Sequence, residues 1–238
     1  MEKSQELLTE LTATESGILM AYVNKRRNNW MNVMQQGNLK LPKFVSTFNL
    51  PAGEGFCINC SSCHDTCYAM QKQIQFSKIK AFRMLNYHLA GTRKDILRYL
   101  ITKYIEVFKP KIVRIHESGD FISQKYINMW FKIMTDFPDV KFYGYTKTKH
   151  LFDFTELTFL HNCNIIDSFL GYEKLINYGT IEYCNELVKE HRAFICPTEG
   201  CMETCTYCLN GLHPCFVIHG NRRKKNENIH KLKKDKFL

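Results

Sequence analysis

Hydrophobic residues in the middle of the chain recur with two different periods. Short apolar runs rich in β-branched and aromatic residues are typical of buried strands. They alternate with longer segments in which apolar residues return every three or four positions, as in helices. The predicted strands are residues 43–50, 111–116, 140–146, 163–170 and 192–197. The predicted helices are residues 76–108, 123–137, 150–160 and 180–190, the first divided in two near Gly91 and Thr92.

This alternation predicts an α/β fold with a mostly parallel sheet, because parallel strands need long crossover connections. Five or six strands fit a partial (βα) barrel-like sheet, a closed barrel or an open doubly wound sheet. Residues 15–36 have the spacing of an amphipathic helix with a glycine directly behind them. We therefore divide the chain into an N-terminal helical segment (1–40), an α/β domain (41–218) and a C-terminal tail (219–238).

Eight of the eleven cysteines form two groups, and each group follows a predicted strand. The first group is Cys57, Cys60, Cys63 and Cys67, and the second is Cys196, Cys201, Cys205 and Cys208. The polar N-terminus lacks the apolar part of a secretion signal, and no apolar run approaches the roughly 18 residues of a membrane span. We expect a cytoplasmic protein that needs no membrane, in which clustered thiols bind metal more often than they form disulfides. Parallel strands would bring both groups to one edge of the sheet.

The spacing of the cysteines favours iron–sulfur chemistry. The first group reads C-x2-C-x2-C-x3-C, the run found in bacterial ferredoxins, with Tyr68 in place of the trailing proline. The second group contains C-x3-C-x2-C, which resembles the motif of radical S-adenosylmethionine (SAM) enzymes, where three thiolates leave one iron open for SAM. Paired cysteines also bind zinc. We expect one or two 4Fe–4S clusters, with SAM as a further cofactor in the enzyme interpretation and zinc as the alternative metal.

Polar residues follow two of the predicted strands. The candidate catalytic residues are His116, Glu117, Asp120, Tyr145 and Lys147. Acidic groups at a strand end bind metal ions or act as general bases, and a lysine there can contact phosphate. The radical SAM resemblance implies that Ser118, Gly119 and Asp120 hold the amino group of the cofactor. In the alternative interpretation, Asp120 or Ser123 caps the helix that starts at 123, and Tyr145 is a core aromatic. Strand alternation places Arg114 on the face opposite Ile115.

Positive charge gathers at the C-terminus. The last twenty residues hold eight Lys or Arg residues against two acidic ones, so they carry +6 of the net charge of +10. A basic tail gains affinity for nucleic acid by releasing counterions, whereas in the alternative interpretation it is a solvated tail. The candidate phosphate contacts are Arg222, Arg223, Lys224, Lys225, Lys231, Lys233 and Lys234.

The blocks "CYA", "VRIHESGDF" and "KFYGYTK", together with the cysteine-rich C-terminal part, resemble the gene product eighty-eight-like family of phage- and plasmid-encoded proteins. The resemblance runs from about residue 43 to residue 219. It implies a mobile-element protein and cysteines at the positions of Cys57, Cys63 and Cys67, which leaves Cys60 as an additional one. It implies no particular reaction.

Three functional hypotheses follow. The first is a phage-type iron–sulfur protein of the host cytoplasm that binds nucleic acid. The second is a radical SAM-like enzyme with an open-iron 4Fe–4S cluster. The third is a zinc-stapled interaction protein that inhibits a host protein complex. The oligomeric state stays open.

Overall fold

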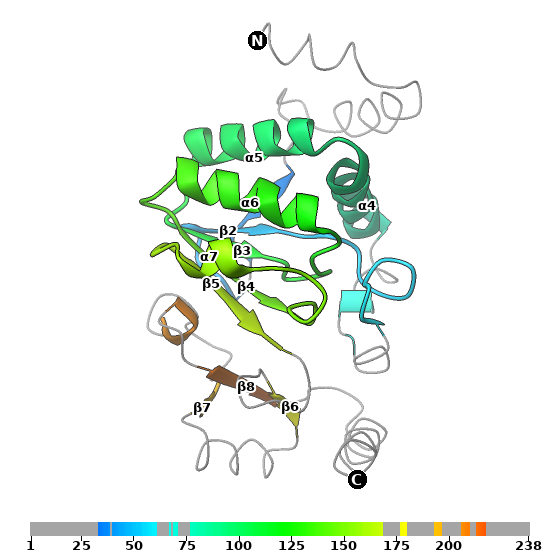
Figure 1. Cartoon of the computed structure of the whole chain (residues 1–238), viewed down its shortest axis with the longest axis vertical. Helices are drawn as coiled ribbons and strands as arrows, with labels where there is room; N and C mark the ends of the chain where they lie inside the picture. The colour runs from blue at the N-terminus through cyan, green and yellow to red at the C-terminus, as the bar shows by residue number, and fades with distance from the viewer. Residues whose placement is uncertain are drawn as a thin grey trace, which may run out of the picture.

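A computed structural model of the chain describes residues 33–38, 40–60, 67, 69–70, 77–168, 177–179, 193–196, 206–209 and 213–217. Its centre is a five-stranded sheet with the order β1-β2-β3-β4-β5 (Figure 1). The strands are β1 (Met34–Gln36), β2 (Val45–Phe48), β3 (Ile112–Ile115), β4 (Lys141–Thr146) and β5 (Cys163–Asp167). β1 pairs antiparallel with β2, and the other neighbours are parallel. The predicted α/β class with a mostly parallel sheet is therefore confirmed.

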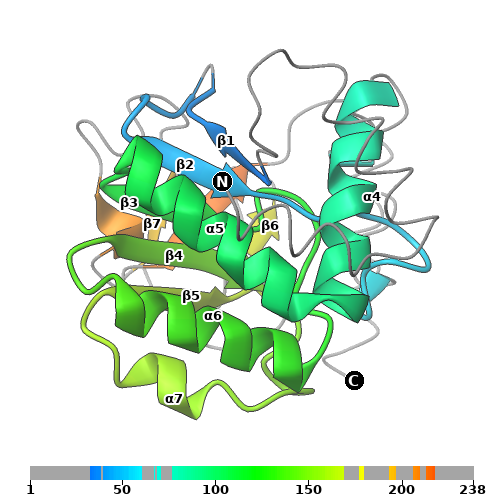
Figure 2. The ribbon, with the colours of Figure 1, turned by 90° about the horizontal axis from the view of Figure 1, so that it is seen from above.

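Helices α5 and α6 lie side by side across one face of this sheet (Figures 1 and 2). The described helices are α4 (Ser77–Thr92), α5 (Lys94–Phe108), α6 (Gln124–Asp136) and α7 (Thr155–Thr158). The predicted division of residues 76–108 is confirmed, since Arg93 separates α4 from α5. The predicted cap of α6 is also confirmed, because the Ser123 hydroxyl accepts a hydrogen bond from the Tyr126 amide at 3.3 Å.

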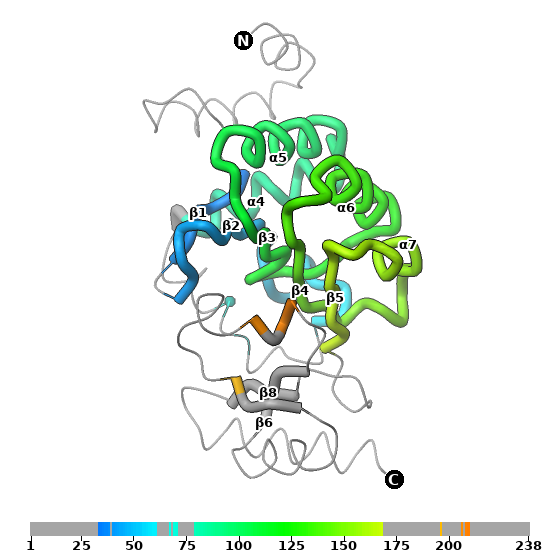
Figure 3. Tube along the Cα trace, turned by 90° about the vertical axis from the view of Figure 1, so that its left-hand side faces the viewer, coloured from blue at the N-terminus to red at the C-terminus, as the bar shows by residue number. Residues whose placement is uncertain are grey.

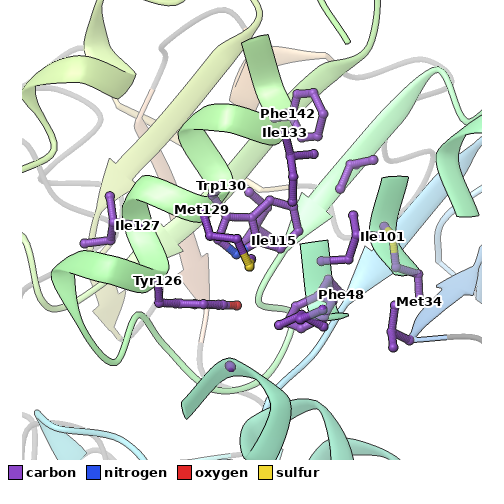
Figure 4. Close-up of a cluster of buried hydrophobic side chains, with 14 of the residues drawn as sticks. Met34, Phe48, Ile101, Ile115, Tyr126, Ile127, Met129, Trp130, Ile133 and Phe142 are labelled. Carbon is purple, nitrogen blue, oxygen red and sulfur yellow. The ribbon is translucent and has the colours of Figure 1, made fainter. Parts of the chain in front are cut away.

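The main core lies between the sheet and these helices (Figure 4). Phe48, Ile115 and Phe142 reach it from three neighbouring strands, and Trp130 and Ile133 reach it from α6. Phe48 and Trp130 meet edge to face, with ring centroids 5.3 Å apart. Each large apolar side chain buried in this way contributes about 1.5–3 kcal/mol, so this layer holds the helices on the sheet.

The opposite face of the main sheet packs on a short 3-10 helix, η3 (Tyr207–Leu209), which contacts β4 and β5. A second sheet lies beyond η3, on the side away from α5 and α6 (Figure 1). Its strands β6 (Asn177–Gly179), β8 (His213–Val217) and β7 (Ala193–Ile195) run parallel in that order. Segments that follow β5 in the chain thus lie on this face, called here the helix-free face because none of the four described α-helices packs on it.

Three sequence predictions need correction. Residues 34–36 were predicted as helix, but they form β1, because Met34 is buried beside β2 in an antiparallel ladder; residues 15–32 lie outside the described residues. The strand predicted at 192–197 belongs to the second sheet, because β7 pairs with β8 rather than with the main sheet. The helix predicted at 150–160 is shortened to α7, since Thr148 forms a turn with Leu151 before it.

The barrel-like shape is not confirmed. In the part of the chain that the structure describes, the main sheet is an open series with β1 and β5 at its two edges. The helix predicted at 180–190 lies outside that part. None of the described helices is both long and apolar enough to cross a lipid bilayer.

We expect Ser123→Ala to lower the free energy of unfolding by about 1 kcal/mol, because the Tyr126 amide loses its capping acceptor. Urea unfolding followed by circular dichroism measures the change. Lys125→Ala, at an exposed position in the first turn of the same helix, is the matched control. Equal stability of the two variants would show that the cap contributes nothing.

Candidate functional site at the carboxyl edge of the main sheet

Asp120 joins the loops that follow β3 and β4. Its Oδ1 accepts hydrogen bonds from the Thr146 hydroxyl at 2.6 Å and the Phe121 amide at 2.7 Å, and its Oδ2 accepts one from the Lys147 amide at 2.8 Å. Burial raises the pKa of Asp120 above its ordinary value, while these hydrogen bonds oppose part of that rise. Both carboxylate oxygens are therefore already used to hold the two loops together.

His116 is buried and carries strained backbone. Its φ is +61°, a left-handed conformation that costs most residues free energy. Its Nε2 lies 2.9 Å from the hydroxyl of Tyr126, and its ring packs edge to face on Phe121. Among the described residues, no hydrogen-bond partner faces its Nδ1. Burial lowers the pKa of His116 to about 3, so the imidazole is neutral at ordinary pH.

Ser118 and Gly119 pack against the end of β2. The Ser118 amide donates to Asn49 Oδ1 at 3.0 Å, and its hydroxyl donates to the Leu50 carbonyl at 2.9 Å. Gly119 has φ +84°, and a Cβ there would lie 2.5 Å from the Cβ of Leu50, so no larger residue fits without movement. Two of the three residues predicted to hold SAM thus fasten the β3 loop to the β2 loop.

Glu117 and Lys147 make more exposed contacts. Glu117 accepts from the side-chain amide of Asn38 at 3.4 Å. The Lys147 ammonium donates to the Ser168 hydroxyl at 3.1 Å, and this hydroxyl donates to the Thr146 carbonyl at 3.1 Å. Lys147, predicted as a phosphate contact, therefore helps to join the ends of β4 and β5.

Cys208, of the second cysteine group, lies on the helix-free face of β4 and β5. Residues 206–209 are the orange segment beside β4 in Figure 3. The Tyr145 hydroxyl donates to Cys208 Sγ at 2.9 Å, and the side-chain amide of Asn164 donates to the Cys208 carbonyl. Burial raises the pKa of Tyr145 well above its ordinary value, so its hydroxyl keeps the proton that it donates.

The segment of the first cysteine group contacts the chain one residue beyond the end of β4. Asn59, between Cys57 and Cys60, donates its side-chain amide to the Lys147 carbonyl at 3.1 Å. Cys57 and Cys60 are both partly buried. Residues of the two cysteine groups are thus held at positions 145 and 147, although 141 positions separate Cys67 from Cys208 in the sequence.

The described part of the chain contains no group of three or more His, Cys, Asp or Glu side chains able to hold a metal ion. Cys63, Cys201 and Cys205 lie outside that part, as do the predicted phosphate contacts of the tail from Arg222 to Lys234. Cys67 and Cys196 are described and partly buried. The predicted metal centre therefore stays a prediction.

No role was predicted from the sequence for Asn59, Asn164, Thr146 or Ser168. Asn59 stands inside the first cysteine group, and the other three lie at or near the ends of β4 and β5. A search for polar residues at strand ends would have found Thr146 and Ser168, because ligands of open α/β sheets bind at the carboxyl ends of the strands. Asn164 lies inside β5, and what distinguishes it is the hydrogen bond that its side chain donates to the Cys208 carbonyl.

We expect wild-type protein to lose stability relative to His116→Asn as pH falls from 6.5 towards 3. In that window the unfolded chain binds a proton at His116 and the folded chain does not, so each pH unit costs up to about 1.4 kcal/mol. Asparagine tolerates the left-handed backbone and does not titrate. Urea unfolding of both proteins at pH 7 and pH 5 measures the difference. His161→Asn, which removes an exposed imidazole, is the control, and the same behaviour in both variants would contradict burial as the cause.

Comparisons with known proteins place this site in a phage context. The chain is 27% identical over 150 residues to the Gene 88 protein of Mycobacterium phage L5, covering 58% of this chain and 60% of that protein. The Gene 88 protein of Mycobacterium phage D29 is 27% identical over 149 residues, with the same coverage. The chain thus spans 60% of the length of these curated relatives. No solved structure matches it significantly.

The matching family model, described as Gene product 88, covers residues 18–172. It starts and ends earlier than the region of resemblance predicted from the motifs. It includes the first cysteine group and the ends of β3, β4 and β5, and it excludes the second cysteine group. Since it covers well over half of the sequence, the chain is a phage-type protein that belongs to the Gene product 88 family.

Proposed function

We propose that the protein is an iron–sulfur protein whose cluster lies at the carboxyl end of β4, and that it binds nucleic acid through its basic tail. One observation carries the first part. Asn59 of the first cysteine group and Cys208 of the second are both hydrogen-bonded to the three residues from Tyr145 to Lys147. The main sheet thereby brings toward one strand end two cysteine groups that are far apart in the sequence.

The cysteine spacing of the chain supports an iron–sulfur cluster. Cysteine thiolates are the usual ligands of such clusters, and a hydroxyl that donates to a ligand sulfur is a typical outer contact of a metal site. Tyr145 makes this contact to Cys208. When bound, a 4Fe–4S cluster supplies one-electron redox chemistry, and its ligation joins the two segments with folding free energy, as structural metal sites do. The chain has cysteines for one or two clusters.

The geometry gives the radical SAM interpretation less support. Ser118 and Gly119 fasten the β3 loop to Asn49 and Leu50, and the Asp120 carboxylate accepts three hydrogen bonds from its own neighbourhood. To bind the amino group of SAM, these residues would have to give up their hydrogen bonds within the protein. A zinc-stapled interaction protein shares the cysteine geometry, and metal analysis separates it from the iron–sulfur protein.

We expect protein purified without oxygen to contain iron and acid-labile sulfide in equal amounts, and Cys208→Ala or Cys57→Ala to lose most of both. The reason is that each substitution removes a proposed ligand. Cys163→Ala is the matched control, because burial raises the pKa of the Cys163 thiol to about 12 and this residue lies on β5 outside both groups. Stoichiometric zinc without sulfide would replace this proposal with the zinc-stapled protein. Equal loss of iron in the Cys163 variant would show that ligation is not specific.

The nucleic-acid part of the proposal rests on charge. The tail from residue 219 carries +6, and phosphate contacts of lysine and arginine release counterions. Such binding needs no base contacts and operates in the host cytoplasm, where a phage-encoded protein would act. The four consecutive cations from Arg222 to Lys225 are the densest part of the tail.

We expect replacement of Arg222, Arg223, Lys224 and Lys225 by Gln to weaken duplex DNA binding and flatten its salt dependence. If all four contact phosphate, the slope of log K against log salt falls by about 3 to 4, at roughly 0.9 for each contact. Fluorescence anisotropy at several salt concentrations measures it. The control replaces the exposed Lys40, Lys43, Lys125 and Lys132 by Gln. An equal effect of the two sets would mean that net charge, and not the tail, attracts DNA.

A further inference from the structure

The amino edge of the main sheet, opposite the candidate site, carries three exposed lysines. At this edge α5 ends before β3, and α6 ends before β4 (Figure 2). Lys109 and Lys111 lie in the connection between α5 and β3, and Lys141 is the first residue of β4. All three residues are exposed to solvent. Basic side chains from two neighbouring connections are thus presented to water at one edge of the fold.

Backbone hydrogen bonds set the order of these residues along the amino edge. The Lys111 amide donates to the Phe44 carbonyl at 3.0 Å, and the Lys141 amide donates to the Lys111 carbonyl at 3.0 Å. The Lys141 ammonium donates to the carbonyl of His161, just before β5, at 3.4 Å. Neighbouring strands of a sheet are about 4.8 Å apart. The residues therefore form a continuous row across the starts of β2, β3, β4 and β5.

The acidic residues near this edge do not neutralise the row. Asp139 is the one acid in the connections from α5 to β3 and from α6 to β4. Glu106 and Asp136, near the ends of the two helices, are ion-paired with basic side chains of the helical layer. Among the described residues, none of the three lysines forms an ion pair. An excess of positive charge is therefore available to an anionic partner.

The segment before β5 brings an exposed aromatic ring to the same edge. The side-chain amide of Asn162 donates to three backbone carbonyls between the end of α6 and the start of β4. Phe159, three residues earlier, is 83% exposed, more than any other large apolar residue that the structure describes. Because Asn162 fixes this segment, Phe159 is held beside the connection that leads to Lys141.

Two further aromatic residues lie among the lysines. Phe108 directly precedes Lys109 and is 39% exposed, and its ring stacks on the buried ring of Tyr104 with centroids 4.4 Å apart. The Lys111 ammonium lies 5.9 Å from the ring centroid of the half-buried Phe44. The amino edge thus alternates cations with aromatic rings, of which Phe108 and Phe159 are exposed to solvent.

We infer that the amino edge binds single-stranded nucleic acid, with its three lysines on phosphates and Phe159 and Phe108 stacked on bases. Proteins that bind single strands without sequence preference combine a basic surface with aromatic side chains, because unpaired bases offer their faces for stacking. The paired bases of a duplex do not offer theirs. This inference rests on the nucleic-acid part of the proposed function and deepens it, since it names the class of nucleic acid and a second contact surface.

The test is fluorescence anisotropy with a labelled single-stranded oligothymidylate at several salt concentrations. We expect replacement of the three lysines by Gln to lower the slope of log K against log salt by about 2, at roughly 0.7 for each phosphate contact. The control replaces the exposed Lys80, Lys125 and Lys132 of α4 and α6 by Gln, and it is expected to keep the wild-type slope. Oligouridylate is measured in parallel, and the tighter ligand identifies DNA or RNA as the target.

Both sets of substitutions are also made in the variant whose tail cations from Arg222 to Lys225 are replaced by Gln. The same loss of slope with and without these cations would support the inference. A wild-type slope without the three lysines, or an equal loss in the control, would overturn it and leave the proposed role of the tail intact. Absence of any nucleic-acid binding by the wild-type protein would overturn both.

A second variant tests the stacking and leaves every charge in place. We expect Phe159→Ala to bind oligothymidylate about tenfold more weakly, because one base loses its stacking partner, and to keep its affinity for duplex DNA. Leu151→Ala is the matched control, since it removes an exposed apolar side chain from the loop after β4, at the opposite edge of the sheet. Unchanged affinity of Phe159→Ala for the single strand, or an equal loss for the duplex, would overturn the inference.

Discussion

The buried carboxylate of Asp120 is the constraint on which the edge of the main sheet depends. A carboxylate taken out of water must be compensated by hydrogen bonds, and here three donors from two loops provide them. Two of those donors belong to Thr146 and Lys147, so Asp120 fixes the end of β4 relative to the loop after β3. The carbonyl of Lys147 then receives Asn59, and Tyr145 just before it receives Cys208. The hydrogen bonds of one buried carboxylate thus fix the part of β4 that contacts Asn59 and Cys208.

This constraint shows that the polar residues of the β3 loop, which look catalytic in the sequence, also hold neighbouring loops together in the fold. His116, Ser118 and Asp120 are all buried, and each is hydrogen-bonded to another part of the protein. The left-handed backbone of His116 and the close contact of Gly119 with Leu50 let the chain turn sharply over the end of β2. Strained backbone and buried polar groups are frequent at functional sites, but they also occur where loops are joined by hydrogen bonds.

Local sequence patterns predicted the helices and strands in which buried residues recur at a regular spacing. The apolar spacing of α5 and α6, the Ser123 cap and the strands β2 to β5 all follow from residues within each segment. β1 could not be predicted in this way, and neither could the second sheet, although its strand β7 lies within the strand predicted at 192–197. A three-residue strand such as β1 exists because a distant partner offers a ladder, and a period cannot be recognised in three residues. Asn59 and Asn164 were missed for the same reason, since their partners lie 88 and 44 positions away.

The boundary of the family match divides the candidate site into a scaffold and a segment that docks on it. Asp120, Tyr145, Asn164 and the first cysteine group lie within residues 18–172, whereas Cys208 lies beyond them. The scaffold side holds two donors to Cys208, namely the Tyr145 hydroxyl and the Asn164 amide. Cys208, which lies outside the matched region, is therefore held at the sheet by contacts that the matched region offers. In this chain the face of β4 and β5 thus positions Cys208 through side chains that belong to the matched region.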